Sequence, residues 1–303
     1  MTGLSTRNPG PDRPMSPWVS ASADLEIRYV TAGDAGLPAA LREVRPAVKT
    51  LWFRGDLPRE AEPAVAIVGA RAASLPACRL AADLAGVAAR AGFAVISGGA
   101  IGIDGAAHAG ALDAGGRTFA VLGCGVDVVY PDRHAGLFQR IAGSGAVLSE
   151  FPPGTKPHRR HFPSRNRLVA GLAGAVLVVE ARQLSGALIT ARLATRMGRQ
   201  LYAVPGSSGT DGLIAACKAQ AVHDGADWLA VLTGQPRPVH LPPAELAAVV
   251  AAVGRGAAAP QVARHLAVPL PAALALLSQA ELAGWILRGP GGVYTSTEVT
   301  LAS

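Results

Sequence analysis

A basic segment is the part of this sequence best suited to chemistry with an anion. Residues 156–168 read KPHRRHFPSRNRL and contain no acid. The segment holds five cations: Lys156, Arg159, Arg160, Arg165 and Arg167. Prolines, an aromatic ring and an asparagine interrupt the run, which argues against a plain solvated helix face. Because close cations repel one another unless an anion lies near, the segment predicts phosphate binding, and its length favours a polymer over a nucleotide.

A glycine-rich segment upstream offers backbone groups suited to the same ligand. Residues 97–105 read SGGAIGIDG, and such glycines allow backbone N–H groups to approach a phosphate. Arg71 follows the apolar residues 64–68, so its guanidinium could hold that phosphate with two hydrogen bonds. A plain surface arginine at a strand end is the alternative. We favour one phosphate site, formed by Arg71 and the backbone N–H groups of the turn at residues 97–102.

Other side chains near these segments are suited to bases and to further phosphates. Phe162 lies among cations, where a ring can stack on a base of single-stranded DNA, although it would be equally ordinary as a core residue. Asn166 is suited to a base edge or to capping a helix. Arg117 precedes one predicted strand and Arg182 follows another, and we expect both at the same rim of the sheet or at its extension.

No pattern of residues predicts catalysis, a cofactor or a metal. Residues 69–74 lack the second and third glycines of a dinucleotide fingerprint, and the sequence contains no Walker A motif. Asp104 and His108 would share a helix face, but no nucleophile accompanies them, so we expect local hydrogen bonds. His158 and His161 lie among arginines that would repel a cation. We therefore expect a protein that is not an enzyme and binds neither cofactor nor metal.

Short apolar runs alternate with alanine-rich stretches along the middle of the chain. The runs lack polar alternation, as in strands covered on both faces, and comprise residues 64–68, 93–97, 119–122, 146–148, 175–179 and 201–204. The intervening helices fit residues 75–91, 104–114 and 185–197. This alternation predicts an α/β fold with a doubly wound, mainly parallel sheet. Ligands of such sheets bind beyond the carboxyl ends of the strands, where the glycines lie.

The 303 residues divide into four parts by composition. Residues 1–36 are rich in proline and are expected to form a largely disordered lead-in. The central domain, 37–232, is followed by a proline-rich linker at 233–243. Residues 244–303 contain three helical stretches and a glycine-tipped hairpin, which is typical of a small winged-helix domain.

The third helical stretch of this small domain is poor in the residues that read DNA. Residues 269–283 contain no Lys or Arg, whereas a helix in the major groove needs polar or cationic side chains. We expect Leu270, Leu274 and Leu277 to form a stripe facing the domain's own core. The small domain is therefore predicted to serve protein contact or domain packing.

Charge and hydropathy indicate the partners and the compartment. The net charge is +7 although only 16% of the residues are charged, so the basic excess is local, which suits a nucleic-acid partner. No apolar run approaches the roughly 20 residues of a membrane span, and the N-terminus lacks a signal-peptide core. The three cysteines form no CxxC pair and are expected to be reduced thiols. We expect a cytoplasmic protein with no membrane partner.

Several distinctive motifs follow one another along the central domain. The most specific are FPSRNR at 162–167, VEA at 179–181 and SGALITA at 185–191. Earlier motifs are LWFRGDL at 51–57, VGAR at 68–71, SGGAIGIDGAAH at 97–108 and LGCGVDVVYP at 122–131. With these motifs, residues 37–228 resemble the bacterial DNA-processing protein A family, also called DprA or Smf. The resemblance implies an extended Rossmann-like domain.

The resemblance also implies a function and a set of site residues. It implies a non-enzymatic homodimer that binds and protects single-stranded DNA and helps load a RecA-type recombinase in natural transformation. By position, it implies a nucleotide pocket of Arg71, Ser97, Gly98, Gly99, Arg159, Phe162 and Asn166. Arg117 and Arg182 match positions of basic DNA contacts, and Ser185 and Gly186 belong to a family signature near the site.

Three features depart from the family pattern. The family often begins with a helical domain, which the proline-rich lead-in does not match. Residues 211–221 differ from the usual sequence near the last helix of the sheet, where a dimer contact could lie. Ala187 stands where a serine is usual, which removes one hydroxyl from the edge of the pocket.

Two other functions remain open from the residues alone. Related folds host phosphoribohydrolases, but these carry a PGGxGT loop followed by a glutamate. The only PGG here, at 290–292, falls in the predicted hairpin of the small domain. A transcription regulator acting through the winged helix is the other possibility. We favour the single-stranded DNA binder.

Overall fold

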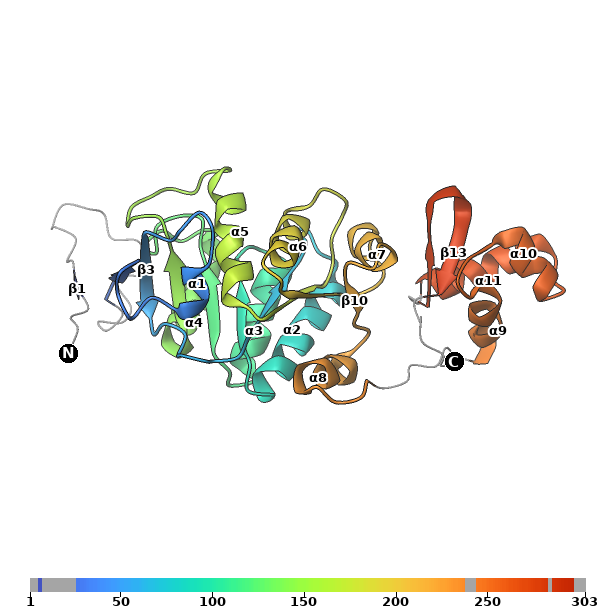
Figure 1. The fold of residues 1–303 in the computed structure, drawn as a ribbon, viewed down its shortest axis with the longest axis horizontal. Coiled ribbons are helices and arrows are strands. Elements are labelled where there is room, and N and C mark those ends of the chain that lie inside the picture. Colours follow the sequence, from blue (N-terminus) through green and yellow to red (C-terminus); the bar gives the residue numbers. More distant parts are fainter. Residues whose placement is uncertain (1–4, 7–25, 238–243, 283–284, 297–303) are drawn as a thin grey trace.

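The computed structural model describes residues 5–6, 26–237, 244–282 and 285–296 (Figure 1). A ten-stranded sheet forms the centre of the larger part, in the order β1-β2-β3-β7-β6-β5-β4-β8-β9-β10. The strands from β4 onward pair in parallel, and β1, β2 and β3 add an antiparallel edge beside β7. This confirms the predicted α/β class with a doubly wound, mainly parallel sheet.

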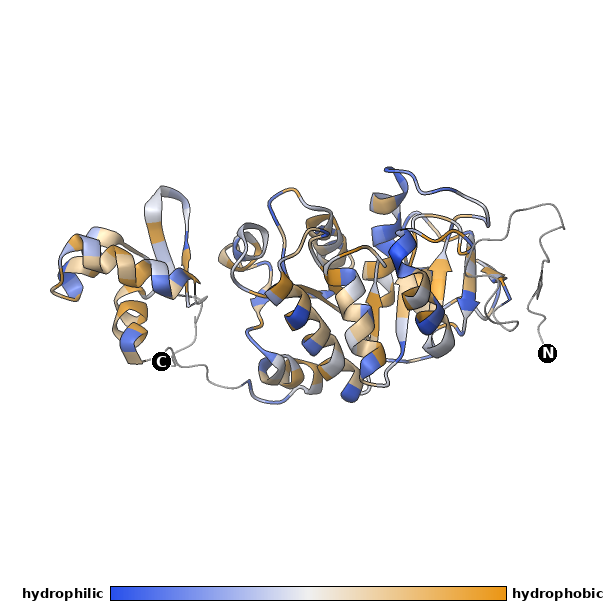
Figure 2. Ribbon diagram, turned by 180° about the vertical axis from the view of Figure 1, so that it is seen from behind, coloured by the Kyte–Doolittle hydropathy of each residue, from blue (hydrophilic) through white to orange (hydrophobic). Residues whose placement is uncertain are grey.

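The parallel strands form where the sequence is apolar without alternation. They are β4 (Ala64–Val68), β5 (Ala94–Ser97), β6 (Thr118–Val121), β7 (Ala146–Ser149), β8 (Ala175–Val178), β9 (Gln200–Ala203) and β10 (Gln220–Ala221). Most of their residues are buried, since helices cover both faces of the sheet. Figure 2 shows the apolar residues gathered along these strands inside the fold.

Helices cover the two faces of the sheet in two sets. One set comprises α2 (Leu75–Arg90), α3 (Ile103–Asp113), α4 (Ala135–Ser144) and α8 (Gly225–Thr233). The other comprises α1 (Ala39–Arg42), α5 (His161–Leu172) and α6 (Gly186–Arg196), while α7 (Ser208–Ala215) packs beside β9. Helices α2 and α3 approach closely at Gly110, where a Cβ would lie 2.1 Å from the Ala82 carbonyl oxygen. Because helices connect the parallel strands, the carboxyl ends of these strands all lie at the same edge of the sheet.

The large sheet includes strands that precede the expected boundary at Leu37. Strand β2 (Arg28–Thr31) pairs antiparallel with β3 (Thr50–Gly55), and β1 (Ser5–Thr6) pairs with β2. The disordered lead-in predicted for residues 1–36 is therefore wrong for residues 28–31, because four residues are enough for a strand when neighbouring strands pair with it. Residues 7–25 of that lead-in lie outside the described residues.

The small C-terminal part has the winged-helix pattern that the sequence predicts. Its helices are α9 (Ala244–Val253), α10 (Ala259–His265) and α11 (Leu270–Leu282). Its sheet has the order β11-β13-β12, formed by Ala257–Ala258, Val293–Ser296 and Ile286–Arg288. Val249, Val262, Leu277 and Ile286 lie in its core. Of the predicted linker, residues 238–243 lie outside the described part of the chain.

The predicted apolar stripe of α11 was wrong in two of its three residues. Leu277 is buried, but Leu270 and Leu274 are 43% and 41% exposed. The buried face instead joins Ala273, Leu277 and Ala280, because the small side chains let the helix approach its neighbours closely. Leu270 and Leu274 consequently form part of an apolar outer surface.

Length and hydropathy of the helices bear on membrane insertion. Among the described residues, no single helix is long and apolar enough to cross a membrane. The pair α10 and α11 reaches the required length and hydropathy only when joined, and these two helices meet at 107°.

Candidate nucleic-acid interface

A cavity of about 700 Å³ lies beyond the carboxyl ends of β4, β5 and β8, and we call it the sheet-edge cavity. Strand order diverges here, since β5 and β8 flank β4 on opposite sides, and such switch points are usual ligand sites of doubly wound sheets. Nine of the predicted site residues line it: Arg71, Gly98, Arg159, Phe162, Arg165, Asn166, Arg182, Ser185 and Gly186. These residues come from four separate stretches of the chain.

Arg71 and Phe162 form the exposed side of the cavity. The Arg71 guanidinium lies 4.7 Å from the centroid of the Phe162 ring, a cation–π contact. Tyr130 extends this apolar surface, with its ring centroid 5.8 Å from that of Phe162. Within the described residues, no carboxylate forms an ion pair with Arg71. A cation and aromatic rings are therefore available to a phosphate and a base together.

Local geometry explains why Phe162 lies at the surface of the cavity. Helix α5 begins at His161, so Phe162 and Pro163 fall in its first turn. Proline is tolerated there because the N–H groups of a first turn have no partner within the helix. The Phe162 ring packs against Gly123, where a Cβ would lie 2.9 Å from Cδ1 of the ring. Glycine at position 123 thus leaves room for the ring.

Arg165 forms the floor of the cavity and is buried. Its guanidinium donates to the carbonyl oxygens of Gly98 and Val121, and its Nε donates to Oδ1 of Asn166 at 3.2 Å. Burial lowers the pKa of Arg165 to about 10 and nearby Asp104 opposes the shift, so the group stays cationic at neutral pH. Nη1 of Arg165 is thus bonded to the backbone that shapes the cavity, and Nε to the Asn166 side chain.

The basic segment does not converge as a unit, which corrects the interpretation from the sequence. Arg165 and Arg167 point inward, and Arg167 forms a two-pronged ion pair with Glu150 at 2.5 and 2.7 Å. Lys156, Arg159 and Arg160 are exposed, and Arg159 lines the cavity. Helical geometry from residue 161 onward separates the inner arginines from the outer ones, so only the outer cations face solvent.

Asn166, Ser185 and Gly186 form the opposite wall. Asn166 donates from Nδ2 to the Gly186 carbonyl oxygen at 3.3 Å, so both ends of its amide are oriented by the protein. Ser185 precedes α6, and its buried hydroxyl has no hydrogen-bond partner in the described part of the chain. Ser185 and Gly186 thus line the cavity next to an amide whose two ends are both held by the protein.

Two of the predicted residues shape the cavity without lining it. Ser97 is fully buried and donates from Oγ to the Ile67 carbonyl oxygen at 2.6 Å, which links β5 to β4. Gly99 has a φ of +69°, and a Cβ there would lie 2.9 Å from the Phe138 ring. Their expected contact with a phosphate stays a prediction.

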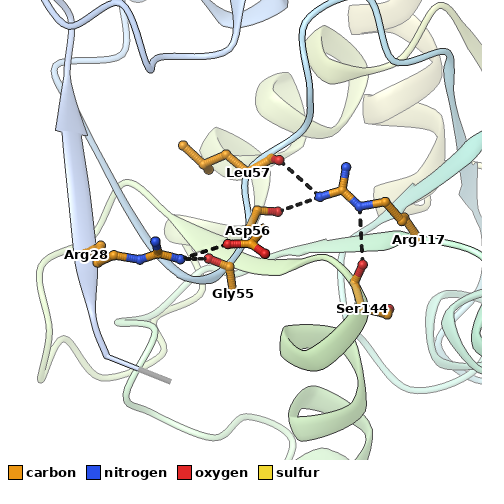
Figure 3. Close-up of polar contacts among 6 residues, drawn as sticks. All are labelled: Arg28, Gly55, Asp56, Leu57, Arg117 and Ser144. Atoms are coloured by element: carbon orange, nitrogen blue, oxygen red, sulfur yellow. Dashed lines mark hydrogen bonds and ion pairs between the residues drawn. The ribbon is translucent and has the colours of Figure 1, made fainter. Parts of the chain in front are cut away.

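Arg117 lies at the other end of the sheet, which corrects its predicted position. It directly precedes β6, so it belongs to the amino edge, whereas the cavity lies at the carboxyl edge. Its guanidinium bonds Glu62 at 2.6 Å and donates to the carbonyl oxygens of Asp56, Leu57 and Ser144. Figure 3 shows Arg117 tied to these carbonyls, with Arg28 bound to Gly55 and Asp56 nearby.

Asp104 and His108 make local hydrogen bonds, as the sequence predicts. Asp104 accepts from the Ala100 backbone N–H at 3.3 Å, and burial raises the pKa of this carboxyl. His108 Nδ1 lies 2.7 Å from Oγ1 of Thr118, which itself donates to the Val95 carbonyl oxygen. That hydroxyl can only accept from His108, so Nδ1 carries the hydrogen. Burial lowers the pKa of His108 to about 3.

Other histidines are also bound locally. His161 lies 3.1 Å from the Gly123 carbonyl oxygen through Nδ1 and stacks on Phe151 with centroids 4.1 Å apart. Among the described residues, no group of three or more His, Cys, Asp or Glu side chains is arranged to hold a metal ion.

Sequence reasoning missed some residues that line the cavity. Tyr130, Ile189 and Thr190 belong to it but were not assigned. Tyr130 stands in the motif at 122–131 and the other two in the motif at 185–191, so those motifs carried a signal that could have been used.

A sequence model of the family described as DNA recombination-mediator protein A matches residues 28–233. The chain belongs to this family. A curated DprA/Smf relative, the putative DNA processing protein DprA of Mycobacterium tuberculosis, is 48% identical over 177 residues, which cover 58% of this chain and 46% of the relative. The chain thus spans about half the length of the curated relatives that match it first.

Solved structures of the family share the fold. The structure of DprA from Streptococcus pneumoniae has a TM-score of 0.61 at 35% identity, covering 72% of this chain and 76% of that one. DprA from Helicobacter pylori, whose structure concerns its single-stranded DNA binding mode, has a TM-score of 0.61 at 29% identity. That match covers 68% of this chain and 96% of the other. The Rossmann-like fold expected from the resemblance is therefore confirmed.

Proposed function

We propose that this chain binds single-stranded DNA in the sheet-edge cavity, through phosphates and base stacking and with little sequence preference. The Arg71 guanidinium over the Phe162 ring carries the proposal, because it offers a cation and a stacking surface at one switch point of the sheet. Arg159, Arg182, Ser185 and Gly186 extend the same site. The single-stranded DNA binding mode of the H. pylori relative supports this assignment.

The wider role follows from family membership. We infer a cytoplasmic homodimer that protects incoming single-stranded DNA and helps load a RecA-type recombinase in natural transformation. The description of the family as a recombination mediator supports this role. We assign residues 28–233 to DNA binding and the small part from residue 244 onward to protein contact, consistent with the exposed Leu270 and Leu274.

We propose that the chain has no catalytic activity. Asp104 and His108, the pair that could exchange a proton, are both bonded to groups of the fold. The hydroxyls beside them, those of Ser97 and Thr118, are buried and donate to the carbonyl oxygens of Ile67 and Val95, so neither is placed to act as a nucleophile. A phosphoribohydrolase would release a base from a nucleoside monophosphate, so absence of base release over hours at micromolar protein is the expected result.

The function is tested by titrating a fluorescent oligothymidine and a duplex of equal length with the full chain. We expect the single strand to bind at least about tenfold more tightly, because a duplex hides its base faces from Phe162. The logarithm of the association constant should fall linearly with the logarithm of salt concentration, by about 0.7 per phosphate contact. Equal affinity for the duplex would contradict the proposal.

A further inference from the structure

Residues 98–100, which we call the glycine turn, are held by side chains from three separate elements. Arg165 of α5 donates to the Gly98 carbonyl oxygen. His134, the last residue of the short helix η1 (Asp132–His134), lies 3.1 Å from the Gly99 carbonyl oxygen through Nδ1. Asp104 of α3 accepts from the Ala100 N–H at 3.3 Å. Each of three consecutive residues therefore has its own side-chain partner.

The hydrogen bond from His134 to the glycine turn has a known donor, and the packing around the ring holds it in place. A carbonyl oxygen can only accept, so Nδ1 of His134 carries the hydrogen. The ring lies against Gly105, where a Cβ would be 2.8 Å from Cε1, and its edge meets the Phe138 ring with centroids 5.9 Å apart. Since the ring is half-buried and fixed on both sides, it holds the Gly99 carbonyl in one orientation.

The residues that closely follow the glycine turn, Gly102 and Ile103, lie against the backbone of Ala70 and Arg71. A Cβ on Gly102 would lie 2.3 Å from the Ala70 carbonyl oxygen and 2.6 Å from that of Arg71. The Ile103 N–H also donates to the Ala70 carbonyl oxygen at 3.2 Å. With so little space between the two segments, a shift of the glycine turn moves Arg71 relative to Phe162.

We propose that His134 is a positioning residue for the DNA site: by holding Gly99 it keeps the glycine turn, and through it Arg71, in place. His134 is absent from the lining of the sheet-edge cavity, so it acts through other residues. This inference rests on the proposed function. Arg165 and Asp104 are buried charged residues, and their replacement would disturb the core. His134 is only partly buried, so its replacement should leave the core intact.

Two substitutions separate the hydrogen bond from the packing. His134→Phe keeps a ring against Gly105 and Phe138 but has no donor. His134→Asn loses the ring but can place an amide N–H where Nδ1 lies. We expect His134→Phe to weaken oligothymidine binding by about three- to tenfold, the effect of one net hydrogen bond, and His134→Asn to stay within about twofold of the parent.

Two further measurements identify how the loss arises. The salt dependence of binding should be unchanged in His134→Phe, because no phosphate contact is removed, whereas Arg71→Ala should flatten it. Hydrogen exchange at the amides of residues 100–103 should be faster in His134→Phe without DNA. A flattened salt dependence in His134→Phe would instead indicate a direct phosphate contact and overturn the positioning role.

The outcomes distinguish this inference from the proposed function. If the parent chain binds the oligonucleotide and both variants bind equally well, the positioning role is wrong and the DNA site stands. If the parent chain does not bind, the proposed function fails and the inference fails with it. Comparable thermal unfolding of the two variants serves as the control for folding.

Discussion

Arg71 and Arg117 lie at opposite ends of the same parallel sheet, and each guanidinium stacks on a phenylalanine ring. Arg71 lies 4.7 Å from the Phe162 centroid and Arg117 lies 5.0 Å from that of Phe119. They differ in what the donors of the guanidinium bind. Arg117 is engaged by one carboxylate and three carbonyl oxygens, whereas in the described residues no ion pair engages Arg71.

This difference separates a structural arginine from one that is free for a ligand. At the amino edge, the Arg117 guanidinium bonds the loop after β3, the end of α4 and Glu62. Four of its hydrogen bonds therefore stabilise the fold. At the carboxyl edge, the donors of Arg71 face solvent over an aromatic ring. Residue type and a neighbouring ring are therefore poor guides to function until the hydrogen-bond partners are known.

The largest effect is expected on stability at the amino edge. Arg117→Ala should lower the free energy of unfolding by about 3 kcal/mol, because Glu62 and three carbonyl oxygens lose their partner. Urea unfolding measures the change. The control is Arg140→Ala, whose pair with Asp113 is exposed and should contribute less than about 1 kcal/mol. Oligothymidine affinity should stay within about twofold, and a large loss of affinity would place Arg117 in the DNA site after all.

At the carboxyl edge, the expected effect is on binding. Arg71→Ala should weaken oligothymidine binding by about thirtyfold, or about 2 kcal/mol, through loss of a charged hydrogen bond to phosphate. The salt slope should fall by about 0.7 in a fluorescence titration. Arg90→Ala, which removes an exposed cation at the far end of α2, is the control and should change neither quantity appreciably. An unchanged salt slope in Arg71→Ala would falsify the phosphate role.

The pH dependence of stability tests whether the amino edge of the sheet serves the fold, because His108 forms a hydrogen bond there with Thr118, the residue after Arg117. The pKa of His108 is about 3 in the fold against 6.5 ordinarily, so below pH 6.5 the unfolded chain takes up a proton that the folded chain refuses. Stability should therefore decrease on acidification. This group should contribute a loss of about 2 kcal/mol between pH 7 and pH 5.

The variant for this experiment is His108→Asn, which keeps a donor toward Thr118 and cannot titrate. Urea unfolding of the parent and the variant at both pH values gives the difference. The variant should lose less stability than the parent on going to pH 5, by about 2 kcal/mol. Equal pH dependence in the two proteins would show that His108 is protonated in the fold or does not titrate independently.

The smallest effect is expected for a third surface, the outer face of α11. Residues 269–283 contain no Lys or Arg, and Leu270 and Leu274 are exposed there, so this face offers little to a phosphate. Deletion of residues 244–303 should leave oligothymidine affinity within about threefold, or about 0.7 kcal/mol. A loss of tenfold or more, or tight duplex binding by the deleted part alone, would contradict protein contact as its role.

The buried strands and the edge of the sheet that holds the cavity could be predicted from the sequence, because short local patterns of residues determine them. Apolar runs without alternation identified the buried strands, and the glycines after β4 and β5 marked the edge where the cavity lies. Helix α3 (Ile103–Asp113) lies within one residue of the expected range 104–114 at both ends. These features depend on residues that are neighbours in the chain.

The errors concern partners that are distant in the sequence. Arg165 reaches carbonyl oxygens 67 and 44 residues away, and Arg167 reaches Glu150, so the basic segment alone could not show which cations are used internally. Arg117 was misplaced for a simpler reason, since a residue before a parallel strand lies at the amino edge. In α11, the buried side depends on how closely Ala273 and Ala280 allow neighbouring helices to approach.

The sheet-edge cavity is built from residues 68–72, 98–104, 159–169 and 182–190 together with Tyr130. Because these stretches meet only after β4, β5 and β8 have paired, no short fragment of the chain can hold the ligand. Binding is thereby linked to completion of the fold, and an oligonucleotide at a hundred times its dissociation constant should stabilise the chain by about 2.7 kcal/mol. Resistance to heat or protease in the presence of single strands would then measure occupancy of the cavity without any label.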